Sequence, residues 1–219
     1  MWKASDGVGS IEVVEVFGND LTVVNSARVS FAKESHELTL GDEKLIKYLA
    51  AHNHISPFFH PQIRLRIKMP IFVAREWFRH QIGLSRNEVS RRYVDSSPEV
   101  WCPSPGELRE RDPNCKQGSK VSQIGGAEEA SLEIREHCNK TIELYSNLLE
   151  KGVAPEVARC VLPQSMYTEF IETGSLAAYA RIARLRTDPS AQREIQVYAR
   201  GVMSLLTPHF PVSWAALTI

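Results

Sequence analysis

The sequence has no excess of either charge, no long apolar run and no apolar signal segment at its start. Its 26 Lys and Arg residues balance 26 Asp and Glu residues, which gives a formal net charge of zero. Proteins that bind nucleic acid through their overall charge are more basic. Membrane spans need roughly 18 consecutive apolar residues, and no stretch approaches that length. These absences predict a cytoplasmic protein with no membrane and no nucleic acid among its partners.

Paired cysteines and the common nucleophile motifs are also missing. The chain has four cysteines: Cys102, Cys115, Cys138 and Cys160. None forms a CxxC pair, which argues against a zinc site or a thioredoxin-like redox motif. No GxSxG motif occurs, and the one cysteine that follows a histidine lies in a predicted helix, where adjacent side chains diverge. Covalent cysteine or serine catalysis therefore has no support in the sequence.

Hydrophobic periodicity predicts an α/β protein with few strands and several helices. Residues 63–69 alternate apolar and basic side chains, which is typical of a half-buried strand, and residues 11–17 also favour a strand. Pro70 is expected to open a helix that ends before Gly83. Further helices are predicted at 43–53, 128–151, 155–162, 175–186 and from Asp188 onward. Residues 96–126 lack periodicity and favour a functional loop or lid within one catalytic domain, 1–219.

The densest polar cluster is RHQIGLSRNEVSRRY, residues 79–93. The segment from Arg75 to Arg92 contains five arginines and two glutamates, with serine and asparagine residues between them. Guanidinium groups match phosphate oxygens, and short hydroxyl and amide groups add fixed donors. The segment predicts an anion site, although an arginine-rich solvated surface would show the same composition.

Two smaller clusters favour ordinary roles when taken alone. His52, His54 and His60 lie close in sequence but lack a carboxylate or cysteine that would complete a metal-ligand set. They indicate a polar pocket lining, and no metal site is expected. Arg181 and Arg184 are three residues apart and share a helix face, which most often means a salt-bridged surface.

The pattern Arg79-His80-x, eight residues, then Ser-x-Arg-Tyr at 90–93 resembles the signature of the flavin-dependent thymidylate synthases. Further segments resemble that family in the same order along the chain: residues 18–31, 52–60, 70–80, 157–163 and 185–196. The resemblance therefore covers most of the chain rather than one motif.

The resemblance implies an α/β (α+β) fold in which a small, mainly antiparallel sheet packs with helices. It implies a homotetramer whose active sites are shared between subunits. It also implies C5 methylation of a pyrimidine nucleotide, with FAD and NADPH as cofactors and 5,10-methylenetetrahydrofolate as the carbon donor. No enzyme cysteine attacks the base in this family, which agrees with the absence of a thiol site.

The same resemblance assigns roles to individual residues. Those expected at FAD are His54, Ser56, Arg79, His80, Gln81, Glu88, Ser175, Leu176, Ala177 and Arg181. Those expected at the nucleotide are Glu76, Trp77, Arg79, Glu88, Ser90, Arg91, Arg92, Arg159 and Arg186. Ser90 and Arg186 are the catalytic candidates. A guanidinium at the uracil edge would stabilise negative charge on the ring, and its removal is expected to cost on the order of 10²-fold in rate.

Three positions depart from the family pattern inside the expected sites. Gln81 replaces an arginine, Ala177 replaces an arginine, and Glu76 replaces a glutamine beside the nucleotide. A carboxylate only accepts hydrogen bonds, so Glu76 would suit a ribose hydroxyl. The family resemblance implies dUMP as the main substrate, and Glu76 and Gln81 motivate UMP, alone or beside dUMP, as the second candidate substrate. A nucleic-acid-binding module and an inactive nucleotide-binding member of the family are the competing hypotheses.

Overall fold

The computed structural model describes residues 1–94, 96–114 and 118–218. Its strands are β1 (Trp2–Lys3), β2 (Ser10–Phe17), β3 (Gln62–Pro70), β4 (Leu84–Glu88), β5 (Arg109–Arg111), β6 (Ser119–Gln123) and β7 (Tyr167–Ser175). Its α-helices are α1 (Asp20–Arg28), α2 (Leu40–Ala51), α3 (Ile71–Trp77), α4 (Ala127–Glu150), α5 (Pro155–Ala158), α6 (Leu176–Arg186), α7 (Arg193–Leu206) and α8 (Pro211–Leu217). Short 3-10 helices occupy Val29–Phe31, Ser56–Phe59, Pro105–Glu107 and Arg159–Val161. Mixed helices with a small antiparallel sheet are the fold class that the sequence predicted.

The main sheet has five strands in the order β1-β2-β3-β7-β4. Strands β1 and β2 are antiparallel, with Trp2 opposite Ile11. Alternation along β3 buries Ile63, Leu65, Ile67 and Met69 completely, as the sequence predicted for a half-buried strand. The buried side chains of the two neighbouring strands, β3 and β7, therefore form the centre of this sheet.

The chain divides into two compact units. The first comprises Met1–Ile67, Glu76–Asn87 and Phe170–Ile219, and the second comprises Lys68–Arg75 and Glu88–Glu169. The expectation of one catalytic domain over residues 1–219 stays a prediction.

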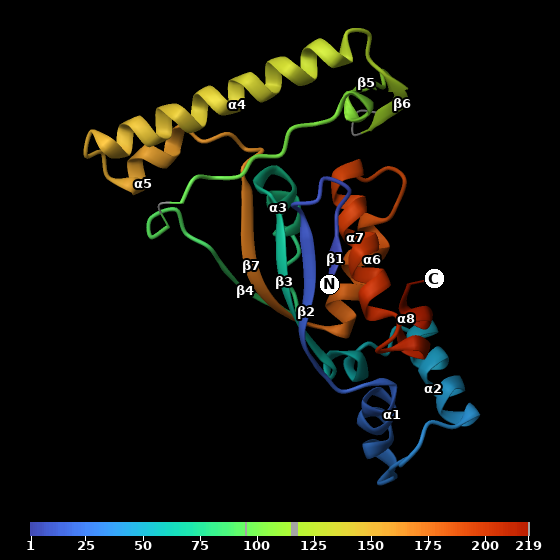
Figure 1. Cartoon of the computed structure of the whole chain (residues 1–219). Coiled ribbons are helices and arrows are strands. Elements are labelled where there is room, and N and C mark those ends of the chain that lie inside the picture. Colours follow the sequence, from blue (N-terminus) through green and yellow to red (C-terminus); the bar gives the residue numbers. More distant parts are fainter. Residues whose placement is uncertain (95, 115–117, 219) are drawn as a thin grey trace. The chain divides into compact units, whose positions relative to one another are not determined.

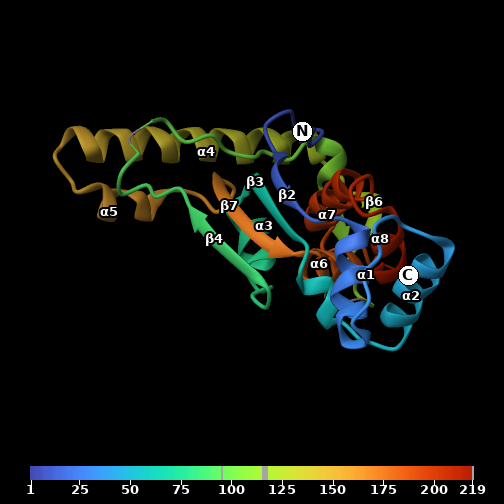
Figure 2. The same ribbon diagram turned by 90° about the horizontal axis from the view of Figure 1, so that it is seen from below.

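In the first unit, α6 and α7 pack against each other, and α7 lies along β1 and β2 (Figure 1). Helix α7 buries an apolar stripe at helical spacing: Ile195, Tyr198, Ala199, Val202 and Leu206. Helices α1, α2 and α8 form a second group in the same unit (Figure 2). The first unit thus combines a sheet-covering helix pair with a small helical cluster.

In the second unit, α4 spans 24 residues and buries one stripe, Ala127, Ser131, Cys138 and Tyr145. The segment 96–126, expected to be a loop or lid, contains a two-stranded antiparallel sheet of β5 and β6 next to the start of α4 (Figure 1). Part of that prediction, residues 115–117, lies outside the described residues. The weak periodicity reflects the short, exposed strands of this sheet.

Several predicted helix boundaries were wrong: the helix predicted at 43–53 begins at Leu40, and the one predicted at 155–162 ends at Ala158. Helix α3 ends at Trp77, so Arg79 and His80 lie beyond its end, and β4 begins within the cluster that had no predicted strand. Helix α7 begins at Arg193 rather than at Asp188, because Asp188 accepts hydrogen bonds from Ser190 and forms a separate turn. Among the described residues, no helix is long and apolar enough to cross a membrane.

Candidate active site

Glycine at two positions allows the turn before β4 to approach the start of α6. Gly83 has a φ of 76°, a left-handed conformation that favours glycine. A side chain at Gly174 would lie 2.9 Å from the Tyr179 ring, too close for normal contact. Ser175 caps α6 by accepting a hydrogen bond from the Ala178 backbone N–H at 3.2 Å, and its own N–H donates to the Gly83 carbonyl. The cap predicted at Ser175 is confirmed, and it fixes where the polar residues of α6 lie.

A buried ion pair anchors the segment after α3. The Nε atom of Arg86 lies 2.6 Å from the Glu172 carboxylate, which is fully buried on β7. The Trp77 indole N–H donates to the same carboxylate at 3.1 Å. Burial raises the pKa of Glu172, while the Arg86 guanidinium opposes that rise. Arg86 also donates to the backbone carbonyl of His80 at 2.7 Å, so the pair holds the chain at the Arg-His motif.

Arg186, the last residue of α6, is held by two side chains. Its Nε–H donates to Nε2 of His80 at 2.9 Å, and its Nη1 forms an ion pair with Glu76. Burial first, and then the positive charges of Arg186, Arg181 and Arg86, together lower the pKa of His80 to about 4. His80 is therefore neutral near pH 7, and this hydrogen bond places its proton on Nδ1.

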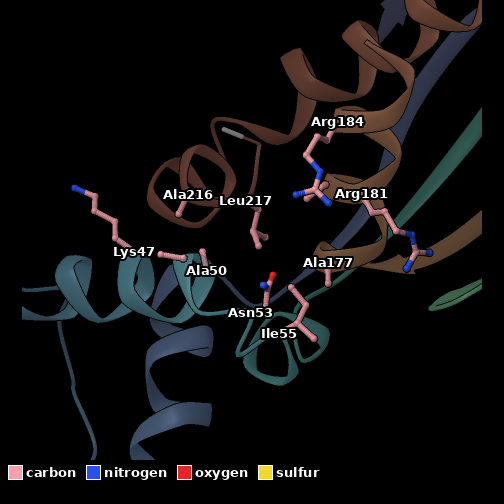
Figure 3. Close-up of a pocket in the computed structure, with 11 residues that line it drawn as sticks. Lys47, Ala50, Asn53, Ile55, Ala177, Arg181, Arg184, Ala216 and Leu217 are labelled. Carbon is pink, nitrogen blue, oxygen red and sulfur yellow. The ribbon is translucent and has the colours of Figure 1, made fainter. Parts of the chain in front are cut away.

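One cavity of about 560 Å³ combines small side chains with cations (Figure 3). Its lining residues are Lys47, Ala50, Ala51, Asn53, Ile55, Ala177, Ala180, Arg181, Arg184, Ala216 and Leu217. Arg181 is fixed by a hydrogen bond from Nη2 to the Ile82 carbonyl at 2.7 Å. Lys47 extends from α2, while Arg181 and Arg184 extend from α6 (Figure 3). The volume suits a small ligand, and the lining carries three positive charges without a carboxylate.

A second cavity of about 690 Å³ lies in the same unit. It is lined by Ser26, Ala27, Arg28, Ser30, Phe31, Lys33, Leu45, Tyr48, Leu49, His54, Ser56 and Pro57. His54 and Ser56, which were predicted at the cofactor, are both exposed here. The structure therefore places the two predicted flavin stretches at different cavities of one chain, with Ala177 and Arg181 at the first and His54 and Ser56 at the second.

The remaining predicted cations lie in the second unit. Arg92 pairs with the Glu156 carboxylate at 3.4 Å, and Arg159 donates to the Glu156 backbone carbonyl at 3.3 Å. Arg91 donates to the Ser96 carbonyl at 2.5 Å. The Ser90 hydroxyl accepts the Arg92 backbone N–H at 3.2 Å. Four predicted nucleotide residues are thus brought together around one turn and the start of α5.

Two further predicted residues have contrasting surroundings. Glu88 accepts a hydrogen bond from the Thr168 hydroxyl at 2.6 Å, within the second unit. Arg79 is exposed, and its guanidinium has no hydrogen bond or ion pair among residues 1–94, 96–114 and 118–218. Gln81 is also exposed.

Among the residues that the structure describes, no cluster of His, Cys, Asp and Glu is arranged to hold a metal ion.

Residues 12–212 match the family model described as thymidylate synthase complementing protein. The chain belongs to this family. It is 41% identical over 211 residues to the flavin-dependent thymidylate synthase of Kosmotoga olearia, covering 95% of this chain and 89% of that one. It is 38% identical over 208 residues to the Thermus thermophilus enzyme, covering 95% and 75%. The chain is therefore an enzyme of the flavin-dependent thymidylate synthase type, and that name implies a flavin cofactor.

A solved structure supports the same assignment. The UMP/dUMP methylase PolB of Streptomyces cacaoi, bound with 5-Br dUMP, superposes with a TM-score of 0.83 at 31% identity, covering 96% of this chain and 94% of that one. The same methylase bound with 5-Br UMP gives a TM-score of 0.79 at 29% identity, covering 96% and 93%. The resemblance to the flavin-dependent thymidylate synthases is thus confirmed at the levels of sequence and fold.

For this flavin-dependent family member, sequence reasoning missed Glu172 and Lys47. Strand β7 was not predicted, so the buried position of Glu172 was not recognised. The signal was present, because Thr168, Phe170 and Glu172 alternate along one face of that strand and are all buried. Lys47 gave no such signal, because a lysine on an amphipathic helix is ordinarily solvated.

Proposed function

We propose that this chain methylates C5 of a uridine nucleotide and converts dUMP to dTMP with bound FAD. The proposal is based on two contacts that fix Arg186: its hydrogen bond to His80 and its ion pair with Glu76. Two partners fix the plane of this positively charged guanidinium. A fixed positive group of this kind can stabilise the negative charge that develops on a uracil ring when its C5 attacks a carbon electrophile.

The proposed reaction balances with a one-carbon donor and a reductant. The methylene carbon comes from 5,10-methylenetetrahydrofolate, and the C5 proton of uracil is released to solvent. NADPH supplies the two electrons and the hydrogen that convert the transferred methylene to a methyl group. Held by the residues proposed for it, the flavin would supply the redox chemistry between NADPH and the transferred carbon, and the folate would leave as tetrahydrofolate.

The exposed cations of the second unit are proposed to bind the nucleotide. Arg92 and Arg159 both lie at Glu156, and their guanidinium groups are suited to phosphate oxygens. Ser90 and Arg91 would add donors from the adjoining turn. Glu88 would accept a hydrogen bond from the sugar or base, as its contact with Thr168 demonstrates that it can. Trp77, predicted at the nucleotide, is fully buried and donates to Glu172, so it would act only indirectly, through the Arg86–Glu172 pair.

The residues at the first cavity fit an anionic flavin nucleotide. Five of its lining residues are alanines, which leave room for a flat ring system, and its cations complement phosphate groups. Ala177 and Arg181 of α6 would hold FAD together with Arg79, His80 and Gln81 from the segment after α3, while Ser175 and Leu176, fully buried at the start of α6, would act by positioning that helix. His54 and Ser56 line a different cavity, which supports the proposal that they serve a neighbouring subunit in a homotetramer with shared sites.

UMP is the second candidate substrate, alone or beside dUMP. Glu76 uses Oε1 for Arg186, while Oε2 has no hydrogen-bond partner among the described side chains. A free carboxylate oxygen can accept a hydrogen bond from a ribose 2′-hydroxyl, which dUMP lacks. The structural relative PolB is a UMP/dUMP methylase.

Tritium release from C5 tests the proposal and ranks the two substrates. Purified chain is supplied with FAD, NADPH, methylenetetrahydrofolate and either labelled dUMP or labelled UMP. We expect folate-dependent release from dUMP, at a rate that falls by about 10²-fold or more in R186Q. The matched control is R193Q, which removes an exposed arginine from the start of α7. Absence of release from both nucleotides would contradict the proposed function, and absence from UMP alone would remove the second candidate.

A further inference from the structure

Three of the donor atoms of Arg186 can be assigned separately. Nε donates to His80, Nη1 pairs with Glu76, and Nη2 has no acceptor among the described residues. The guanidinium is planar, so fixing Nε and Nη1 also fixes the direction in which the Nη2 hydrogens point. A ligand therefore meets Arg186 at Nη2 without displacing either holding residue.

Arg186 has one group of opposite charge in direct contact, the carboxylate of Glu76. Glu76 places a carboxylate directly on the guanidinium, and both side chains are about three-quarters buried, with exposures of 25% and 22%. His80 is neutral. Arg181 and Arg86 add positive charge near His80, but Arg181 points to the Ile82 carbonyl and Arg86 is paired with Glu172. The carboxylate of Glu76 is therefore the nearest group that reduces the positive field of Arg186.

We propose that Glu76 is a positioning and charge-tuning residue, which orients Nη2 of Arg186 toward the uracil and lowers the positive field that the uracil experiences. This inference rests on the proposed function, because it requires a uridine nucleotide at Arg186. Two roles of Glu76 are separable by substitution. E76Q keeps an oxygen that can accept the Nη1 hydrogen bond but removes the charge, whereas E76A removes both.

Fluorine NMR of bound 5-fluoro-dUMP reports the field at the uracil through the pKa of the probe's N3 imide. The fluorine withdraws electrons from the ring and brings ionisation of the N3 imide into an accessible pH range, and its chemical shift reports that ionisation. A negative charge within about 4–6 Å shifts a pKa by one unit or more. In flavin-loaded enzyme, we expect E76Q to lower the imide pKa of the bound probe by about one unit relative to the unsubstituted chain. E15Q removes an exposed carboxylate from its pair with Arg64 in the same unit and should leave the imide pKa unchanged.

Steady-state kinetics separate the positioning role. We expect E76Q to retain kcat within about threefold, while E76A lowers kcat by about tenfold or more because Nη2 is no longer aimed. A merely structural role would lower the stability of both variants without moving the imide pKa. An unchanged imide pKa in E76Q would overturn the inference but leave the proposed function intact. Failure of every variant, including the unsubstituted chain, to bind the probe would overturn both.

Discussion

The candidate arginines of the two units differ in burial and in ion pairing. In the first unit, Arg186 and Arg86 are partly buried and each is paired with a glutamate. In the second unit, Arg92 is half exposed, Arg159 is exposed, and both contact the exposed Glu156. A buried pair fixes the geometry of a guanidinium, whereas exposed pairs are screened and easily exchanged. The comparison predicts that changes in the first unit affect stability and the chemical step, while changes in the second affect nucleotide affinity.

The largest effect is expected from breaking the Arg86–Glu172 pair. E172A leaves the Arg86 charge in a buried position without its carboxylate and removes the acceptor of the Trp77 indole. We expect a loss of about 3–5 kcal/mol in the free energy of unfolding, measured by urea titration. The control E15Q should change it by less than about 0.5 kcal/mol. Both glutamates lie in the first unit, so equal, small losses in both variants would show that its buried pair stabilises the fold no more than an exposed pair does.

The next effect is expected from R186K, which keeps the charge but not the planar set of donors. Lysine cannot donate to His80 and Glu76 and also present a fixed third donor. We expect kcat for nucleotide methylation to fall by about 10²-fold, with KM changing much less. A rise in KM with kcat unchanged would place Arg186 in binding rather than in the chemical step.

A smaller effect is expected from the buried neutral His80. Its folded pKa of about 4 lies below the usual 6.5, so between these values the unfolded chain binds a proton that the folded chain does not. Through His80, the free energy of unfolding should therefore fall by about 3 kcal/mol as pH decreases from about 6.5 to about 4, and this contribution is complete below pH 4.

H80Q should remove that pH dependence, as measured by urea unfolding at several pH values. Asp42, whose pKa is lowered to about 2, contributes in a lower window, between about 4 and 2. A stability profile of H80Q that still falls between pH 6.5 and 4 would contradict the assignment to His80.

The smallest effect is expected from R92Q and R159Q in the second unit. Each removes an exposed charge, so we expect the free energy of unfolding to change by less than about 0.5 kcal/mol. Each should raise KM for dUMP by about fivefold to tenfold, and the increase should shrink at high salt because exposed charges are screened. A large loss of stability in either variant would contradict the division between the units.

The sequence predicted the elements whose own pattern is strong and missed those defined by partners elsewhere in the chain. Alternation marked β3, and Ser175 marked the start of α6, because both signals are local. Strand β7 was missed because its glutamates broke the apolar pattern that marks a strand, although Glu172 is buried by pairing with Arg86. The ion pair of Glu76 with Arg186 connects residues that are 110 positions apart in the sequence, so no local pattern could predict it.

The candidate residues and the roles assigned to them stay predictions. What could not be predicted was their division between units and the partners that they use. The replacement of glutamine by Glu76 illustrates the point. From sequence it suggested a contact with the sugar, while the structure adds the ion pair with Arg186.

Arg186, fixed by Glu76 and His80, is proposed to belong to a site that methylates a uridine nucleotide with flavin. The most direct test is product analysis after flavin-loaded enzyme is mixed with NADPH, methylenetetrahydrofolate and dUMP. We expect a nucleotide heavier by one CH₂ group, formed in equal amount to the NADPH oxidised, and little of it with R186K. Oxidation of NADPH with dUMP recovered unchanged would contradict it.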